Sequence, residues 1–247
     1  MWECVLSPWQ TRFVQKNKTT GGASLRRCSL CAKSIASGDM IVELDYLKIK
    51  TESGILYGGN QKYFGKAVSK SGCGMIAACD TLLYLSGKGG GEISFSEYVS
   101  YVEKLRDSVF YKDTRNMLGI FPRRLANILA EKSGRRFAYY PAVKFLSADG
   151  KKLADYISDS IKRGVPVIVR VGASPDGLPY KIKYPASGKN CTGKMSWHYI
   201  TVTGISESGI LTFSSWGGKG TASCAELYRH FGFTGGIVGI SADDHHS

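Results

Sequence analysis

The stretch Lys70-Ser-Gly-Cys-Gly-Met-Ile-Ala-Ala-Cys79 carries the strongest signal for both the fold and the chemistry of this sequence. It places Cys73 between Gly72 and Gly74, where a loop enters an apolar run that continues to residue 85. A helix that begins here directs its unpaired N–H groups and the positive end of its dipole at the sulfur, which favours a thiolate. We therefore predict a helix over residues 74–85, with Cys73 as an exposed nucleophilic thiol at its entrance.

A nucleophilic thiol needs a base, and the sequence contains four histidines. His245 and His246 lie in a polar tail, and His230 lies in a predicted short helix without a distinguishing context. His198 instead begins the predicted strand Trp197-His-Tyr-Ile-Thr-Val-Thr-Gly204, at the mouth of an apolar strand face. We predict that His198 is the base that serves Cys73.

The residues after this strand predict a hairpin that brings a third group to the imidazole. Residues 205–209 have the composition of a turn, and residues 210–214 form the returning strand. This register places His198 opposite Ser214 to Trp216, and side chains directly across an antiparallel ladder are close enough to touch. A hydroxyl at this position could orient the ring, and Trp216 could shield the pair from water.

Local signals predict helices in the first part of the chain and mostly strands after it. Ser94 and Glu97 form a capping box that opens a helix, and Pro122 and Gly134 mark the start and stop of the next. A further helix over 151–163, strands over 166–171, 199–204, 210–214 and 236–240, and a short helix over 224–231 complete the prediction. The run 217–220 is predicted to be a turn that lines the cleft. This order indicates an α+β fold.

The first fifty residues differ from the rest in composition. Arginines and lysines gather here, and no acidic residue lies between Glu3 and Asp39. Residues 40–50 alternate well enough to be a strand, whereas the preceding Gly-, Ser- and Thr-rich stretch is typical of an arm. We therefore divide the chain into a basic, partly ordered extension at 1–50 and a catalytic domain at 51–247.

The bulk composition is that of a globular protein with a strongly basic surface. Of the 247 residues, 43% are hydrophobic, which suffices for a sizeable core, and the formal net charge is +13. No nucleic-acid-binding motif accompanies the charge, so a solvated basic face that could attract acidic peptides is favoured over nucleic acid. No apolar run approaches a membrane span, and no secretory signal is recognised, so a cytoplasmic location is expected.

Other motifs do not indicate a metal or a cofactor. Cys28-Ser-Leu-Cys31 is a single CxxC without a second pair or a nearby histidine, which does not complete a zinc site. The glycine-rich run 87–91 lacks the preceding strand and the Lys-Ser/Thr of a phosphate-binding loop, so an interhelical loop is predicted. Seven irregularly spaced cysteines favour reduced thiols over a disulfide framework.

Residues from about 58 to 240 resemble the papain-like cysteine peptidase superfamily, and most closely its C39-like branch. The Ser71-Gly-Cys-Gly74 turn is similar to the nucleophile turn of that family, and Trp197-His198 followed by Thr-Val-Thr-Gly resembles its histidine strand. Ser214-Ser-Trp-Gly-Gly218 resembles the Asn-Ser-Trp-Gly stretch of papain, and the order Cys, His, orienting residue also matches. The resemblance implies a helical lobe packed on a C-terminal antiparallel sheet.

The resemblance also implies roles for further residues. Ser214 occupies the position at which the family has Asn or Asp, so a shorter and neutral side chain would orient the imidazole. Gln61 is similar to the upstream glutamine that, with the N–H of Cys73, completes the oxyanion hole. Gly72, Gly74, Trp197 and Trp216 are expected to line the cleft, and no metal or cofactor is required.

These expectations favour a cysteine peptidase or a related amide hydrolase that forms a thioester intermediate on a peptide or protein substrate. The basic surface favours an acidic substrate. An acyltransferase, in which an amine or a thiol resolves the thioester, is a second possibility. A third is a catalytically silent module that holds a peptide in the cleft, and it is supported by serine at position 214.

Overall fold

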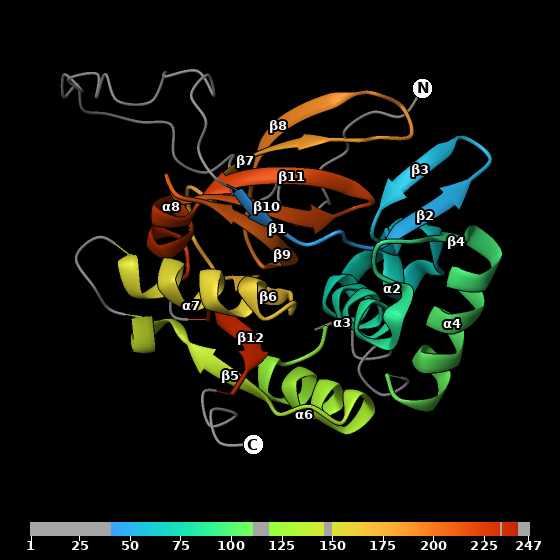
Figure 1. The fold of residues 1–247 in the computed structure, drawn as a ribbon, viewed down its shortest axis with the longest axis horizontal. Coiled ribbons are helices and arrows are strands. Elements are labelled where there is room, and N and C mark those ends of the chain that lie inside the picture. Colours follow the sequence, from blue (N-terminus) through green and yellow to red (C-terminus); the bar gives the residue numbers. More distant parts are fainter. Residues whose placement is uncertain (1–40, 111–118, 146–149, 233, 242–247) are drawn as a thin grey trace.

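The computed structural model describes residues 41–110, 119–145, 150–232 and 234–241 (Figure 1). Its helices are α2 (Lys66–Ser71), α3 (Cys73–Leu83), α4 (Phe95–Ser108), α6 (Pro122–Ser133), α7 (Lys151–Lys162) and α8 (Cys224–Arg229). Its strands are β1 (Ile41–Glu43), β2 (Lys48–Thr51), β3 (Gly54–Tyr57), β4 (Glu92–Ser94), β5 (Phe137–Pro141), β6 (Val167–Val171), β7 (Leu178–Lys183), β8 (Asn190–Met195), β9 (His198–Ser206), β10 (Ile210–Ser215), β11 (Gly218–Ser223) and β12 (Gly236–Ile240).

One large antiparallel sheet organises the described part of the chain. Its order is β5-β12-β6-β9-β10-β11-β7-β8, and β1 pairs with β9 outside this path. β9 is rich in β-branched residues, and its first eight residues are buried because both faces of the sheet are covered. A small second sheet joins β3, β2 and β4. The mixed helix and antiparallel-strand content confirms the predicted α+β class.

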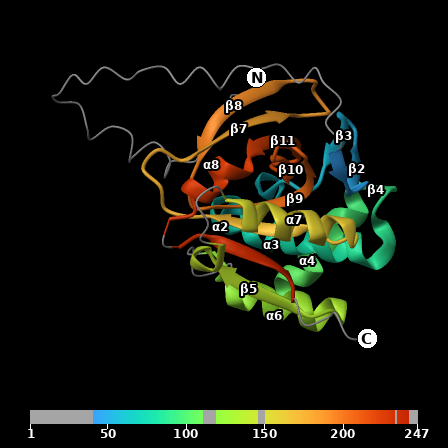
Figure 2. The same ribbon diagram turned by 60° about the vertical axis from the view of Figure 1, so that its left-hand side comes forward.

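The two faces of the sheet carry two separate apolar clusters. Val167, Val169 and Val171 of β6 alternate onto the face that packs with α7. Ile168 of the same strand faces the other way, into the cluster that includes residues of α3 and α6. Figures 1 and 2 show α7 and α6 along the strands and the β7–β8 hairpin at the opposite, upper end of the molecule.

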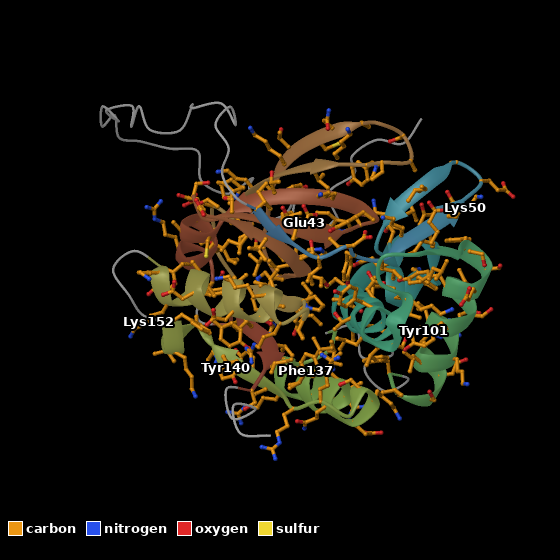
Figure 3. The ribbon with its side chains drawn as sticks, in the orientation of Figure 1. Glu43, Lys50, Tyr101, Phe137, Tyr140 and Lys152 are labelled. Carbon is orange, nitrogen blue, oxygen red and sulfur yellow. The ribbon has the colours of Figure 1, made fainter. Side chains whose placement is uncertain are left out.

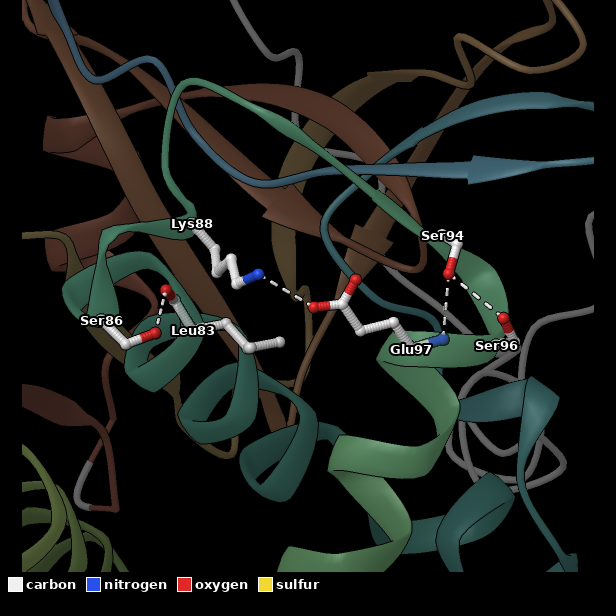
Figure 4. Close-up of polar contacts among 6 residues, drawn as sticks. All are labelled: Leu83, Ser86, Lys88, Ser94, Ser96 and Glu97. Atoms are coloured by element: carbon white, nitrogen blue, oxygen red, sulfur yellow. Dashed lines mark hydrogen bonds and ion pairs between the residues drawn. The ribbon is translucent and has the colours of Figure 1, made fainter.

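The start of α4 shows how local chemistry sets an element boundary. The Oγ atom of Ser94 accepts a hydrogen bond from the N–H of Glu97 at 3.1 Å, as the capping box predicts. The Glu97 carboxylate does not return to Ser94; it pairs instead with the Nζ atom of Lys88 at 3.0 Å (Figure 4). At α6, Pro122 occupies the first turn, and Gly134 ends the helix with a φ of 68°.

The predicted boundary at residue 50 is too late. β1 pairs antiparallel with β9, and Tyr46, Leu47 and Ile49 are fully buried. The predicted single strand over 40–50 is two strands, β1 and β2, which belong to different sheets. Residues 41–50 are therefore part of the folded unit, while the basic cluster and the CxxC motif lie outside the described residues.

Several strands carry too weak a sequence pattern to be predicted. β7 is rich in lysine, β8 and β11 contain lysine, glycine and threonine, and less buried positions alternate with more buried ones along all three strands. The run 217–220, predicted as a turn, mostly belongs to β11. The turn is made by Trp216 and Gly217, both with a positive φ. Figure 3 shows Tyr101 on α4 in the helical part, and Phe137 and Tyr140 on β5 at the sheet edge.

Candidate active site

Cys73 is the first residue of α3, as the sequence predicts. Gly72 ends α2, donating its N–H to Val68 at 2.7 Å, and also precedes α3 without a side-chain cap. Gly74 lies so close to β9 that an added Cβ atom would stand 3.0 Å from the ring of Tyr199. The small residues around Cys73 therefore allow the helix start to approach the central strand.

Burial decides the ionisation of this thiol. It raises the pKa of Cys73 above its ordinary value, while hydrogen bonds from the backbone N–H groups of Tyr199 and Gly74 and the charge of Arg170 act in the opposite direction. The predicted exposure of Cys73 is wrong, because the residue is half-buried. Its desolvation outweighs the helix start and disfavours the thiolate. The hydrogen bond from Tyr199 places the sulfur beside the residue that follows His198.

His198 begins β9 and is held on two sides. Its Nε2 atom lies 2.7 Å from the Oγ atom of Ser215, and its ring stacks on Trp216 with centroids 4.2 Å apart and planes at 20°. Only 7% of the residue is exposed, and burial lowers the pKa of the imidazole to about 3. The Nδ1 atom makes no hydrogen bond to any residue that the structure describes. The ring is therefore neutral, with one nitrogen free to take a proton.

The Ser214 hydroxyl is not hydrogen-bonded to the imidazole, although the resemblance assigns it the orienting position. Its Oγ atom donates to the carbonyl oxygen of Tyr57 at 2.9 Å. In the ladder, Ser214 pairs with Thr201, and an irregularity lies between residues 212 and 213. The groups that meet His198 nevertheless lie within the predicted range Ser214 to Trp216. The chain then bends at Trp216, whose φ is 51°, so the hydroxyl that meets His198 is that of Ser215.

Gln61 lies in a single 3-10 turn that directly follows Asn60. The Asn60 side chain accepts a hydrogen bond from the N–H of Lys62 at 3.0 Å, which fixes the start of this turn. The Nε2 atom of Gln61 donates one hydrogen to the carbonyl oxygen of Ser69 at 2.8 Å. An amide nitrogen carries two hydrogens, so one remains for another acceptor.

One small cavity brings the candidate residues together. Its volume is about 20 Å³, enough for a group the size of one water molecule or one carbonyl oxygen. The candidates among its lining residues are Cys73, His198, Gln61, Ser214, Ser215 and Trp216. Within the described residues, no hydrogen bond joins the thiol to the imidazole. Gly72, Gly74 and Trp197, which were expected to line the cleft, do not line this cavity. Trp197, the residue before His198, is 58% exposed.

Asp80 also lines the cavity, and the sequence reasoning missed it. It lies two turns after Cys73 on α3, and its two carboxylate oxygens accept hydrogen bonds of 2.7 Å from the N–H of Gly59 and the hydroxyl of Tyr98. Burial raises its pKa to about 7, although both hydrogen bonds act to lower it. A signal existed, because Asp80 is the only charged residue in the apolar run of α3 and shares the face of Cys73 by seven-residue spacing.

Asp80 anchors a set of bonds that hold the two sides of the cavity together. The carbonyl oxygen of Gly59 accepts from the N–H of Gly217 at 2.9 Å, and the N–H of Tyr57 donates to the carbonyl oxygen of Gly217 at 3.0 Å. Gly58 has a φ of 70°, and an added Cβ atom would stand 2.1 Å from the Oγ atom of Ser214. The segment that leads to Gln61 is thus fixed against the one that carries Ser215 and Trp216.

The described residues contain no group of three or more His, Cys, Asp or Glu side chains that could hold a metal ion. In this part of the chain, no helix combines the length and the apolar character needed to cross a bilayer. Comparison of the whole sequence with known protein families and with curated proteins finds no match.

Proposed function

We propose that this chain is a cysteine peptidase or a related amide hydrolase with a papain-like arrangement, in which Cys73 is the nucleophile and His198 is the base. The observation that carries the proposal is the shared cavity, because residues from α3, from the loop before it and from two distant strands converge there. The bond between Nε2 and Ser215 leaves Nδ1 as the nitrogen that can exchange a proton with the thiol.

The reaction begins from a neutral thiol and a neutral imidazole. Cys73 attacks the substrate carbonyl carbon while its proton passes to Nδ1 of His198, and the carbonyl oxygen becomes an oxyanion. The N–H of Cys73 at the helix start and the second Nε2 hydrogen of Gln61 are the donors available to that oxygen. The C–N bond then breaks, the imidazolium protonates the leaving amine, and a thioester remains.

Water completes the cycle. It attacks the thioester carbonyl and gives one proton to His198, and collapse of the second tetrahedral intermediate breaks the C–S bond. The imidazolium returns that proton to the sulfur, so the acid product leaves and the thiol is regenerated. The stacked indole of Trp216 covers one face of His198 throughout and limits competing access of water to the ring.

A second candidate function is a silent peptide-binding module. It is favoured by the missing hydrogen bond between the thiol and the imidazole, and by a serine in place of the amide or carboxylate that the papain resemblance leads one to expect. In that case the polar groups would only hold a peptide, and no thioester would form.

Alkylation distinguishes these candidates. The rate of iodoacetamide labelling at Cys73 is measured by mass spectrometry in the wild type and in His198→Ala, with Cys191, another half-buried cysteine, as the internal reference. Base assistance predicts that the His198→Ala change slows labelling of Cys73 by about tenfold or more and leaves Cys191 unchanged. Equal rates in both proteins would reject the catalytic pair and favour the silent module.

A further inference from the structure

Arg170 is a cation on the sheet face that also carries the nucleophile. It lies on β6, directly opposite Tyr199 of β9, the residue after His198. Alternation along β6 places it on the same face as Ile168, which packs into the cluster that includes Cys73. Arg170 is thus a charged side chain on the same face of the sheet as an apolar cluster and Cys73.

The guanidinium of Arg170 is held by aromatic rings alone. Its Cζ atom lies 5.6 Å from the ring centroid of Trp197 and 5.9 Å from that of Tyr199. Within the described residues it makes no ion pair and no hydrogen bond, although the side chain is half-buried. Arginine carries five N–H donors in a planar fork that matches a carboxylate, and here all of them remain available.

Trp197 is kept in an unusual position next to this cation. Its backbone φ is 53°, a region that L-residues other than glycine seldom adopt, and its N–H donates to the carbonyl oxygen of Gly172 at 3.2 Å. The ring is 58% exposed instead of packed in the core. Trp and Arg are enriched at the contacts that contribute most to binding, and strained backbone clusters at functional sites. Here an exposed indole, one residue before His198, lies beside a guanidinium that has no ion pair within the described residues.

The charge of Arg170 reaches the nucleophile. It is one of the influences that oppose the effect of burial on the pKa of Cys73, so guanidinium and sulfur share one electrostatic environment. A substrate group bound at Arg170 would therefore lie close to the reacting carbonyl.

We propose that Arg170 and Trp197 form a subsite for a carboxylate of the peptide substrate, adjacent to the bond that Cys73 attacks. The guanidinium binds the carboxylate through paired hydrogen bonds, and the indole covers the apolar part of the same residue. This assignment rests on the proposed function of Cys73 and narrows it to peptides with an acidic side chain or a free C-terminal carboxylate at this position.

The first test compares two alkylating reagents of the same reactivity type. Iodoacetate carries a carboxylate and iodoacetamide does not, so the ratio of their rates at Cys73 reports recruitment of the anion. Arg170→Gln is expected to lower this ratio by roughly tenfold, in keeping with the strength of charge-assisted hydrogen bonds. Lys181→Gln, which removes an exposed cation from β7, is the matched control for net charge and is expected to change the ratio less than about twofold.

The outcomes separate the subsite from the proposed function. Equal ratios in Arg170→Gln and the wild type, with Cys73 still reacting in a His198-dependent manner, would overturn the subsite alone. A parallel loss of both rates in Arg170→Gln would show that Arg170 acts only on the sulfur, and would also overturn it. A Cys73 labelling rate that does not depend on His198 would reject the catalytic proposal. The subsite is then tested by peptide binding.

Binding is therefore measured without the nucleophile. Fluorescent peptides that differ only in an aspartate or asparagine side chain, and in a C-terminal carboxylate or amide, are titrated into Cys73→Ala and into Cys73→Ala/Arg170→Gln. A preference of about tenfold for one carboxylate, lost with Arg170, supports the subsite and identifies which of the two sources it takes. Affinities independent of both carboxylates, or unchanged by Arg170→Gln, would overturn it.

Discussion

The Nε2 atom of His198 lies 2.7 Å from the Oγ atom of Ser215, and this hydroxyl, with the indole of Trp216, fixes the imidazole. A serine hydroxyl is neutral and short, so it orients the ring but stabilises a positive charge on it less than a carboxylate would. The neighbouring Ser214 bonds to the main chain of Tyr57 instead. The two serines therefore have separable effects.

Ser215→Ala is expected to slow the release of p-nitrophenolate from p-nitrophenyl acetate by roughly fivefold, because one hydrogen bond of about 1 kcal/mol to the base is lost. Ser214→Ala is its matched control. It should leave the rate within about twofold and instead lower the free energy of unfolding in urea by about 1 kcal/mol. A slower reaction in Ser214→Ala than in Ser215→Ala would show that Ser214 orients the imidazole.

The resting site is expected to contain neutral partners. Since burial lowers the pKa of His198 to about 3 and raises that of Cys73, neither group is charged between pH 5 and pH 8. Histidine nitrogen shifts measured by NMR should show a neutral ring at pH 6, and the thiolate absorbance attributable to Cys73 should appear only above the ordinary thiol range. An imidazolium at pH 6 would mean that the thiol and the imidazole form an ion pair.

Trp216→Ala is expected to raise the pKa of His198 towards its ordinary value of 6.5, because water then reaches the stacked face and solvates the imidazolium. Trp216→Phe keeps a ring at this position and should give an intermediate pKa. The same NMR titration measures both variants. A pKa that stays near 3 in Trp216→Ala would show that burial by other residues dominates.

Asp80→Asn is expected to change how stability depends on pH. Folding raises the pKa of Asp80 from 3.8 to about 7, so between these values the folded state binds the extra proton and stability falls as pH rises. His198 acts in the opposite direction, because its pKa is lower in the folded state and acidification below 6.5 favours unfolding. Both groups are buried, so solvent screens neither effect strongly.

Removing the Asp80 contribution should make the change in unfolding free energy from pH 5 to pH 7 more positive by about 2 kcal/mol. Urea unfolding at the two pH values measures this difference. Asp155→Asn, an exposed residue of α7, serves as the control and should leave the difference unaltered. A matching pH dependence in Asp80→Asn and the wild type would show that the carboxyl stays ionised.

Gln61→Ala is expected to lower kcat for p-nitrophenyl acetate by about tenfold to a hundredfold while KM changes little, because an oxyanion donor acts mainly in the transition state. Asn60→Ala, which removes only the side chain at the start of the turn, is the comparison. A larger effect on KM than on kcat would assign Gln61 to substrate binding.

Local chemistry made the helix starts and the position of Cys73 predictable. Ser94, Pro122 and Gly134 mark helix ends through signals that involve only neighbouring residues. The glycines on either side of Cys73 likewise indicate that it lies at a helix start. Non-local features were not accessible in this way. The register of β9 with β10 includes an irregularity between residues 212 and 213 that no turn signal predicts. The pattern gave the range Ser214 to Trp216 for the group opposite His198, and the bend at Trp216 determines that this group is Ser215.

Other misses have the same physical origin. β7 and β8 form a hairpin with one outward face and few β-branched residues, so their pairing depends on β11 and not on their own pattern. The role of Asp80 depends on Gly59 and Tyr98, which approach it only after folding. The predicted boundary at residue 50 followed the composition of the arm, whereas burial shows that Tyr46 and Leu47 already belong to the folded unit.

The pairing of β1 with β9 has a consequence for the order of events during synthesis. Val42 is made early, yet its partner Ile205 emerges from the ribosome only after most of the described chain, and the cavity likewise needs residues near both 61 and 216. Such distant pairing is slow to form and cannot start on a short nascent chain. Cys73 therefore leaves the ribosome long before His198, so a nascent chain that ends before β9 contains the thiol without the imidazole.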